Sequence, residues 1–196
     1  MKVVLASASE RRLELLARLV KEFTVIVSDF DESKVIVKSS IEKYVEDIAT
    51  GKAEAVAENI DFDAIIIAAD TIVSIDKEIL GRPNNEDDAF NMFSRFSGNT
   101  HKVYTSLVVI NTKTGKVIKS TEATEVKFSK LTESEITEYI QSEEPLDKAG
   151  AYGIQGIGGA FVEELRGCYY NVVGLSLNRL RKILLEIKWY RVGNLL

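Results

Sequence analysis

The sequence predicts an α/β protein with a mixed sheet, because short apolar runs alternate with segments whose apolar residues recur at helical spacing. The most informative run is residues 64–69, six consecutive apolar residues that indicate a central strand buried on both faces. Further strands are expected at residues 3–6, 23–27, 71–75, 79–80, 103–111, 117–128 and 161–165. Helices are expected at residues 10–20, 41–58, 86–96, 133–142 and 172–187.

Each expected helix has a signal of its own. Ser9 is suited to cap the first helix, and Ser39 with Glu42 has the spacing of a capping box for the second. Pro145 follows the fourth helix, which must end before it. The apolar faces predicted for the first, third and last helices carry Leu13, Leu16, Ala17 and Val20; Ala89, Met92, Phe93 and Phe96; and Leu177, Leu180, Leu184 and Ile187.

The connections complete the predicted order. Residues 71–75 and 79–80 are expected to form a hairpin, and residues 112–116 to join the two long strands that flank them. Residues 147–159 are expected to form a loop. At 196 residues, the chain suits one domain, residues 1–196, with two lobes around a cleft.

Composition narrows the classes of partner. The formal net charge is −5, which makes the chain a poor non-specific binder of duplex nucleic acid. Cys168 is the single cysteine and cannot form an internal disulfide bond, so a reducing compartment is expected. No apolar stretch approaches the length of a membrane span, and the first residues do not have the pattern of a signal peptide. These observations predict a soluble cytoplasmic protein that does not act at a membrane.

The first candidate site is the segment from Ser7 to Arg12, where a strand end, two hydroxyls, a helix start and two arginines come together. Unpaired amides at a helix N-terminus attract anions, and the guanidinium groups of Arg11 and Arg12 can bind phosphate oxygens. Ser7 and Ser9 would assist them. The alternative is an ordinary helix cap followed by solvated arginines, and the sequence chemistry leaves both open.

The second candidate is Asp70, which follows the predicted central strand. Ligands of open α/β sheets bind outside the carboxyl ends of strands, where a carboxylate can hold a divalent metal or accept a proton from water. Glu32, at the end of an acidic stretch, could supply a second metal ligand. Lys52 falls on the otherwise apolar stripe of the second helix, a misfit of the kind that often marks a site. The alternative for Asp70 is a residue that starts a turn.

The third candidate is the glycine-rich segment from Lys148 to Gly159, whose backbone can approach a ligand closely. It lacks the ending of a Walker loop and the pattern of a dinucleotide-binding turn. A purely structural bend is the alternative. With one histidine, His101, and one cysteine, the chain offers no zinc cluster.

Taken together, five stretches resemble the Maf family, the nucleotide pyrophosphatases first known as septum-formation inhibitors. They are LASASERRLELL (5–16), AADTIV (68–73), LGRP (80–83), FSGNTHKVYT (96–105) and EPLDKAGAYGIQGIGG (144–159). They occur in the expected order over nearly the whole chain. The resemblance implies a two-lobed mixed-sheet fold similar to that of inosine triphosphate pyrophosphatases, with a central nucleotide-binding cleft.

The resemblance also implies the reaction, which is cleavage of a nucleoside triphosphate to the monophosphate and pyrophosphate with a divalent cation, Mg²⁺ or Mn²⁺. In the residues of this chain, it implies Asp70 as the proton acceptor, and it matches Glu32, Lys52, Arg82 and Lys148 to polar positions around the triphosphate. Together with the candidate sites above, the expected phosphate-binding residues are Ser7, Ser9, Arg11, Lys52, Arg82 and Lys148, and the expected metal ligands are Glu32 and Asp70.

Arg12, Thr71 and Gln155 match positions that set substrate specificity and, with the SASERR and ADT motifs, resemble the dTTP/UTP subfamily. The alternatives are the same chemistry on 7-methyl-GTP or another modified nucleotide, and a nucleotide-binding regulator of cell division. A homodimer is implied by family likeness alone.

Overall fold

The computed structural model describes residues 1–37, 39–142 and 144–189. Its sheet has seven strands in the order β2-β1-β3-β5-β6-β7, with β4 paired to β3, and both parallel and antiparallel pairs occur. The predicted α/β class with a mixed sheet is therefore confirmed. The strands are β1 Lys2–Leu5, β2 Thr24–Val25, β3 Ala64–Ile75, β4 Glu78–Leu80, β5 Thr100–Asn111, β6 Lys116–Phe128 and β7 Val162–Arg166.

Six α-helices and four short 3₁₀ segments are described. The helices are α1 Glu10–Ala17, α2 Ile41–Glu58, α3 Glu86–Phe96, α4 Glu133–Ile140, α5 Tyr169–Val173 and α6 Leu177–Glu186. The 3₁₀ segments are η1 Glu32–Lys34, η2 Glu144–Asp147, η3 Ala149–Ala151 and η4 Ile157–Phe161. No described helix has the length and apolar character needed to cross a membrane.

The chain divides into two compact units. The first unit contains residues 1–70, residues 105–122 and the chain from Gly174 onward, and the second contains residues 71–104 and 123–173. Three of the four boundaries fall within β3, β5 and β6, and the fourth falls between α5 and α6.

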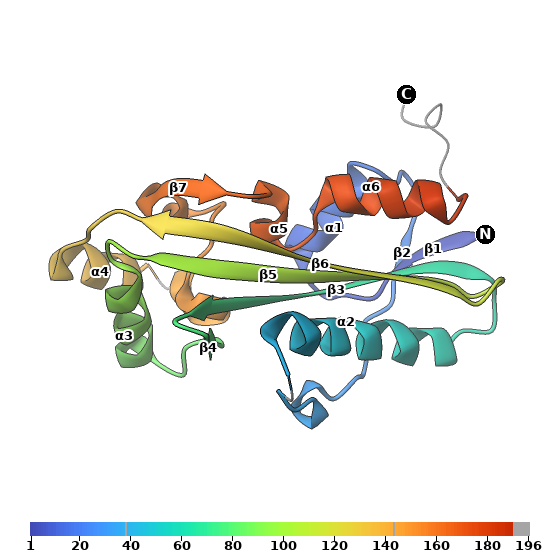
Figure 1. Ribbon diagram of the computed structural model, residues 1–196, viewed down its shortest axis with the longest axis horizontal. Helices are drawn as coiled ribbons and strands as arrows, with labels where there is room; N and C mark the ends of the chain where they lie inside the picture. The colour runs from blue at the N-terminus through green and yellow to red at the C-terminus, as the bar shows by residue number, and fades with distance from the viewer. Residues whose placement is uncertain (38, 143, 190–196) are drawn as a thin grey trace. The chain divides into compact units, whose positions relative to one another are not determined.

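In the first unit, β1 and β2 pair in parallel, and so do β1 and β3. Helix α2 covers one face of this part of the sheet, and α1 and α6 lie on the opposite face (Figure 1). Ala49, Ala53 and Val56 of α2 pack against Ile66 and Ala68 of β3 in a fully buried cluster. Because side chains alternate along a strand, β3 also buries its other face, as its continuous apolar run predicts.

The second unit has its own core, built largely from aromatic rings. Phe93 and Phe96 of α3 contact Phe128 of β6, with ring centroids 5.7 and 5.6 Å apart. Tyr139 of α4 contacts Phe93 at 4.7 Å, and Tyr152 contacts Phe128 at 5.0 Å. These rings anchor the glycine-rich segment, since Tyr152 belongs to it.

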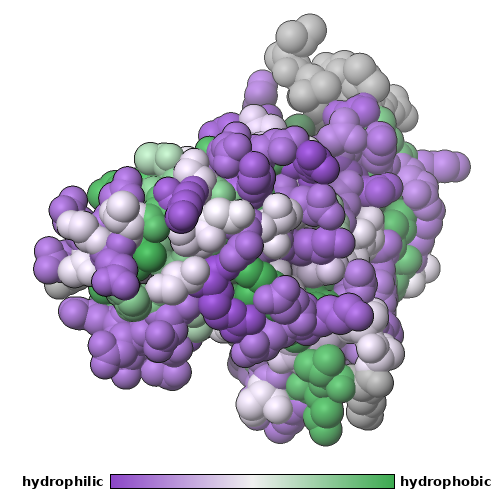
Figure 2. Space-filling model, turned by 60° about the vertical axis from the view of Figure 1, so that its left-hand side comes forward, coloured by the Kyte–Doolittle hydropathy of each residue, from purple (hydrophilic) through white to green (hydrophobic). Residues whose placement is uncertain are grey.

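The surface of the face shown in Figure 2 is mainly hydrophilic. Some large apolar side chains are nevertheless exposed, Val27, Ile36 and Val37 among them. Single exposed apolar residues are normal on folded proteins.

Several predicted elements differ from the structure. The strand expected to stop before Asp70 continues to Ile75, because Thr71, Ile72 and Val73 are β-branched and keep the extended conformation. Asp70 therefore lies inside a strand, and the prediction that it follows a strand end was wrong.

The final helix expected at residues 172–187 is two helices, α5 and α6. Gly174 has a φ of 118°, which no helix allows, and Ser176 is the N-cap residue of α6. Near the N-terminus, α1 ends at Ala17 rather than Val20, and it buries Leu15 and Leu16 while Leu13 is 40% exposed. The cap of α2 is Ser40 rather than Ser39, since the Ser40 hydroxyl accepts from the Lys43 amide.

Candidate functional site

In the first unit, the chain leaves β1 and turns directly into α1. The Ala6 amide donates to the Ile67 carbonyl at 2.8 Å, which extends the pairing of β1 with β3 by one residue. Ser9 then caps α1, its hydroxyl accepting from the Arg12 amide at 3.4 Å. This local order is the one predicted from the sequence, with a strand end, a serine cap and a helix start in succession.

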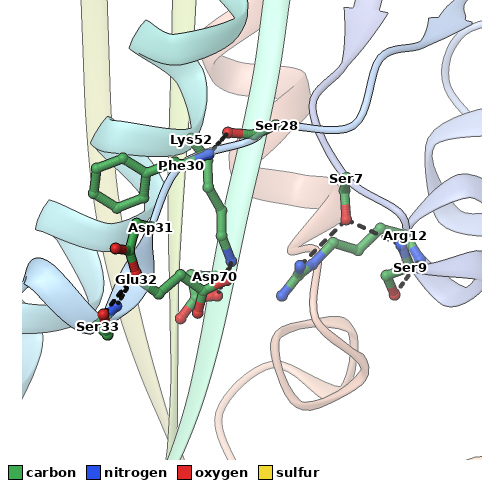
Figure 3. Close-up of polar contacts among 10 residues, drawn as sticks. All are labelled: Ser7, Ser9, Arg12, Ser28, Phe30, Asp31, Glu32, Ser33, Lys52 and Asp70. Atoms are coloured by element: carbon green, nitrogen blue, oxygen red, sulfur yellow. Dashed lines mark hydrogen bonds and ion pairs between the residues drawn. The ribbon is translucent and has the colours of Figure 1, made fainter.

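Arg12 is held by groups from two parts of the first unit, of which Figure 3 shows Ser7 and Ser9. Its Nε donates to the Gly174 carbonyl at 2.9 Å, and its Nη1 donates to the Ser7 hydroxyl at 3.4 Å. The same hydroxyl accepts from the Ser9 amide at 3.2 Å. Ser7, Ser9 and Arg12 thus form one cluster, as predicted. The break between α5 and α6 supplies the carbonyl at Gly174, a contribution that the helix pattern did not predict.

Charge on neighbouring side chains acts on Arg12. Burial lowers the pKa of its guanidinium below the ordinary value, and the negative charge of Asp70 opposes that shift. The positive charge of Arg11 lowers the pKa of Arg12 further. Arginine remains a cation in proteins, so this corner of the first unit carries fixed positive charge.

A second cluster joins the side chains of Lys52, Asp70 and Glu32 (Figure 3). The Lys52 Nζ lies 2.6 Å from Asp70 Oδ1 and 2.8 Å from Glu32 Oε1. The side chains of Lys52 and Asp70 are 15% and 12% exposed, whereas that of Glu32 is 53% exposed. Lys52 lies on the inward stripe of α2 because it has these partners. The ion pairs with Asp70 and Glu32 explain why a lysine stands on an otherwise apolar stripe.

Short turns and one helical glycine hold Glu32 near α2. The Phe30 amide donates to the Ser28 hydroxyl at 3.1 Å, and the Ser33 amide donates to Asp31 Oδ1 at 3.1 Å. The Phe30 ring packs on Gly51 so closely that a Cβ at Gly51 would overlap it. Gly51 precedes Lys52, so this contact places the start of η1 beside the lysine. Sequence reasoning missed Gly51 and Phe30; a glycine inside an otherwise strong helix is the signal that could have found them.

The remaining predicted residues belong to the second unit. Thr71 is its first residue and is half-buried in β3. Arg82 is exposed after β4, and Gln155 is exposed in the glycine-rich segment. The Lys148 Nζ donates to the Glu144 carbonyl at 2.7 Å. The expected loop at 147–159 contains η3 and the start of η4, so it is more ordered than the glycine content suggests.

Glu144, the first residue of η2, contacts the glycine-rich segment and was not singled out by sequence reasoning. Its carboxylate accepts hydrogen bonds from the Tyr139 hydroxyl and from the amides of Ile157 and Gly158. Burial by itself would raise the pKa of Glu144, but these donors outweigh it and hold the pKa below its ordinary value. The only available signal was its place in the EPLDKAG stretch.

In the first unit, Glu32 and Asp70 are the two carboxylates that contact Lys52. Both carboxylates approach the same Lys52 ammonium, so their oxygens converge on one point. Among the residues that the structure describes, no group of three or more histidine, cysteine, aspartate or glutamate side chains is placed to hold a metal ion. Chemically, the first unit thus combines a cationic corner at Arg12 with a pair of carboxylates at Lys52.

Comparison with known proteins identifies the family. The model of the Maf-like protein family matches residues 2–187. A dTTP/UTP pyrophosphatase of Clostridium botulinum (strain Alaska E43 / Type E3) is 62% identical over 186 residues, which cover 95% of this chain and 99% of that protein. A dTTP/UTP pyrophosphatase of Clostridium beijerinckii is 62% identical over 188 residues, 96% of this chain and 100% of that protein.

Two solved structures show more distant likeness. The Ham1 protein of Staphylococcus aureus matches with a TM-score of 0.48 and 15% identity, covering 95% of this chain and 100% of that one. A nucleoside-triphosphatase / dITP/XTP pyrophosphatase from Mycobacterium abscessus matches with a TM-score of 0.45 and 12% identity, covering 96% of each chain. The family assignment depends on the sequence matches, which extend over nearly the whole chain: this protein belongs to the Maf-like protein family.

Proposed function

We propose that this protein hydrolyses dTTP and UTP to the nucleoside monophosphate and pyrophosphate. The substrate follows from the curated relatives, two of which are 62% identical over almost their full length and carry the name dTTP/UTP pyrophosphatase. The observation that carries the chemistry is the buried Asp70 carboxylate, held by Lys52 with Glu32 beside it. Such a carboxylate can accept a proton from the attacking water, while nearby cations bind the phosphates.

In this proposal Asp70 is the general base. Lys52 occupies one oxygen of Asp70, and an ionised carboxylate has a second oxygen that can accept the proton of a water molecule. The ion pair orients the carboxylate, because both side chains are largely buried and have little freedom. Water attacks the α-phosphorus, the bond to the bridging oxygen breaks, and pyrophosphate leaves with the electron pair of that bond.

The residues present fit a divalent cation such as Mg²⁺ or Mn²⁺. Two converging carboxylates are a hard-oxygen donor set, and Mg²⁺ in nucleotide enzymes is held by one or two carboxylates together with substrate phosphates. Glu32 and Asp70 would hold the cation. When bound, it supplies positive charge that stabilises the negative charge developing on the phosphate oxygens.

In this proposal, serine hydroxyls and cationic side chains bind the triphosphate, and three further residues recognise the base. Ser7, Ser9, Arg11, Lys52, Arg82 and Lys148 would bind phosphate oxygens, and Arg12, Thr71 and Gln155 would set specificity. For the first unit, the support is the contact of Ser7 and Ser9 with Arg12. For the second unit, the support is the resemblance of the LGRP and AYGIQG motifs to the Maf family.

We further propose that the enzyme acts in the cytoplasm, where its nucleotide substrates occur, and that it forms a homodimer. The single cysteine is consistent with a reducing compartment. The homodimer rests on family resemblance alone, and light scattering on the purified protein tests it.

Product analysis tests the proposed function. The purified chain is incubated with MgCl₂ and each of UTP, dTTP, CTP, ATP, GTP and 7-methyl-GTP, and the products are separated by chromatography. Monophosphate and pyrophosphate from UTP and dTTP are expected. Release of orthophosphate would contradict the position of cleavage, and turnover of 7-methyl-GTP with neither UTP nor dTTP used would contradict the substrate. Nucleotide binding without turnover would favour a regulator.

A further inference from the structure

Glu144 connects three parts of the second unit through its hydrogen bonds. Its Oε1 accepts from the Tyr139 hydroxyl at 2.9 Å and from the Gly158 amide at 3.1 Å. Its Oε2 accepts from the Ile157 amide at 2.8 Å. Its backbone carbonyl accepts from the Lys148 Nζ at 2.7 Å. One residue thus links α4, the lysine that opens the glycine-rich segment and the 3₁₀ turn η4 near its end.

The η4 turn depends on an outside acceptor. The first amides of a helical turn have no partner within the turn, and a side chain at the N-cap usually accepts from them. Here the N-cap is Gly156, which makes no such bond, and Glu144 accepts from Ile157 across 13 positions of the chain. A Cβ at Gly156 would overlap the Glu144 carboxylate. Gly156 and Glu144 are therefore complementary: the glycine leaves the space that the carboxylate fills.

This arrangement fixes the backbone on both sides of Gln155. The Gly156 amide donates to the Gly153 carbonyl at 3.1 Å, which closes a turn with Ile154 and Gln155 at its corner. Ile154 packs against the aromatic core of the unit, and the Gln155 side chain is exposed. Glu144 holds the next residue but one, Ile157, from the other side. Gln155 is presented to solvent on a turn that is anchored at both ends.

We propose that Glu144 is a positioning residue that sets base selectivity by holding the turn on which Gln155 is presented. The inference rests on the proposed function, in which Gln155 recognises the pyrimidine. A glutamine side chain offers an NH₂ group that donates and a carbonyl oxygen that accepts, so it distinguishes uracil from cytosine only if its orientation is fixed. In this role Glu144 acts through the backbone amides of Ile157 and Gly158, which donate to its carboxylate.

A double-mutant cycle tests this role. We compare wild type, Glu144→Ala, Gln155→Ala and the double variant, and measure kcat and KM for UTP and CTP with Mg²⁺. Glu144→Ala is expected to lower the ratio of kcat/KM for UTP over CTP by about tenfold or more, mainly through KM. In the Gln155→Ala background the same change is expected to lower the ratio no further. Glu133→Gln, an exposed glutamate on α4, is the matched control and should leave the ratio unchanged.

Two milder variants keep the test decisive if Glu144→Ala does not fold. Glu144→Gln retains one accepting oxygen and should give an intermediate ratio, and Tyr139→Phe removes one donor to the carboxylate. Amide hydrogen exchange reads the anchoring directly, without substrate. The amides of Ile157 and Gly158 are expected to exchange faster in both variants than in wild type.

The outcomes distinguish a failure of the role of Glu144 from a failure of the proposed function. Turnover of UTP with an unchanged UTP/CTP ratio in folded Glu144 variants would overturn the role of Glu144 alone. Additive losses in the double variant, or a Gln155→Ala ratio equal to that of wild type, would show that Glu144 does not act through Gln155. Failure of the wild type to hydrolyse either UTP or dTTP would overturn the proposed function and the selectivity role with it.

Discussion

Asp70 is the residue on which the proposed chemistry depends most directly. Asp70→Asn keeps the shape of the side chain and an oxygen for Lys52, but an amide cannot take the proton of the attacking water. We expect kcat for UTP to fall by about 10²–10⁴-fold, while the affinity for a non-hydrolysable UTP analogue at saturating Mg²⁺ changes little, because Glu32, the phosphates and the amide oxygen can still hold the cation. Steady-state kinetics and calorimetric titration measure the two quantities. Asp61→Asn, an exposed aspartate of the same unit, is the control, and unchanged turnover in Asp70→Asn would remove Asp70 from the mechanism.

The two hydrogen bonds of the Arg12 side chain depend on the planar, forked geometry of its guanidinium. Nε and Nη1 donate in two directions, to Gly174 and Ser7, and a lysine ammonium cannot reproduce that geometry. We expect Arg12→Lys to raise the KM for UTP by about tenfold with a smaller change in kcat. Arg18→Lys, at the exposed end of α1, serves as the control in the same assay. An Arg12→Lys enzyme with the KM of wild type would exclude the fork from substrate binding.

The burial of His101 makes the stability of the fold depend on pH. It is the only histidine of the chain, it is buried among Phe96, Phe128 and Tyr152, and its Nε2 lies 2.8 Å from the Tyr152 hydroxyl. Burial lowers the pKa of His101 to about 3, against an ordinary value of 6.5. Between these values the unfolded chain binds a proton that the folded chain does not, so stability falls as the pH falls from 6.5 towards 3.

The slope attributable to His101 approaches about 1.4 kcal/mol per pH unit inside that window. Urea unfolding at several pH values measures it. Carboxylates also titrate in acid, so the quantity compared is the difference between wild type and His101→Gln, which removes the titration. Burial raises the pKa of Tyr152, which therefore does not titrate in the window. Equal slopes for the two proteins would contradict a neutral buried His101.

At the scale of elements, α2 contains Gly51 in its interior, where alanine would ordinarily make a helix more stable. Gly→Ala inside a helix ordinarily stabilises it by about 1 kcal/mol. At Gly51 the added Cβ would overlap the Phe30 ring, so we expect Gly51→Ala to destabilise the fold by about 1–3 kcal/mol instead. Turnover of UTP should fall as well, because Phe30 leads directly into Glu32. Urea unfolding and steady-state kinetics measure the two effects.

A second substitution shows whether the steric clash is the cause. In Gly51→Ala/Phe30→Leu the smaller side chain leaves room for the new methyl group, and part of the lost stability should return. If the double variant is less stable than wild type by the sum of the losses in the two single variants, the contact between Phe30 and Gly51 is not what sets the response.

The elements also show where pattern reasoning succeeds. Helix α3 has its predicted bounds, and the hairpin of β3 with β4 forms with Val73 opposite Leu80. Helical periodicity and turn residues are local signals, so they are readable in short windows. The end of a strand is a weaker signal. Asp70 is polar, but its strand continues beyond it because the following residues are β-branched. The reason for a carboxylate at this position is visible only in its contact with Lys52.

For the whole molecule, ligand binding links stability to the proposed cation. A ligand that binds only the folded chain stabilises it by about 2.7 kcal/mol at 100 times its Kd. We expect a non-hydrolysable UTP analogue with Mg²⁺ to raise Tm by several degrees, and EDTA to remove most of that rise, because Glu32 and Asp70 would hold the cation only together with the phosphates. Differential scanning fluorimetry measures Tm.

The matched control is the cation without nucleotide, which should move Tm little. A rise in Tm that is the same with EDTA as with Mg²⁺ would contradict metal-dependent binding. An equal rise with duplex DNA would contradict the expectation drawn from the net charge of −5.

The sequence by itself determined the fold class, the family and the candidate residues, because periodicity, turn chemistry and motifs are all recorded in short stretches of chain. The tertiary structure decided which of these residues meet. Lys52 reaches Asp70 across 18 positions, Arg12 reaches Gly174 across 162, and Glu144 reaches Ile157 across 13. Contacts of this kind depend on how separate elements pack, and no local pattern encodes them. Packing brings Lys52, which looks misplaced in the sequence, into an ion pair with Asp70. It also brings Glu144 to the Ile157 amide, beside the turn that presents Gln155.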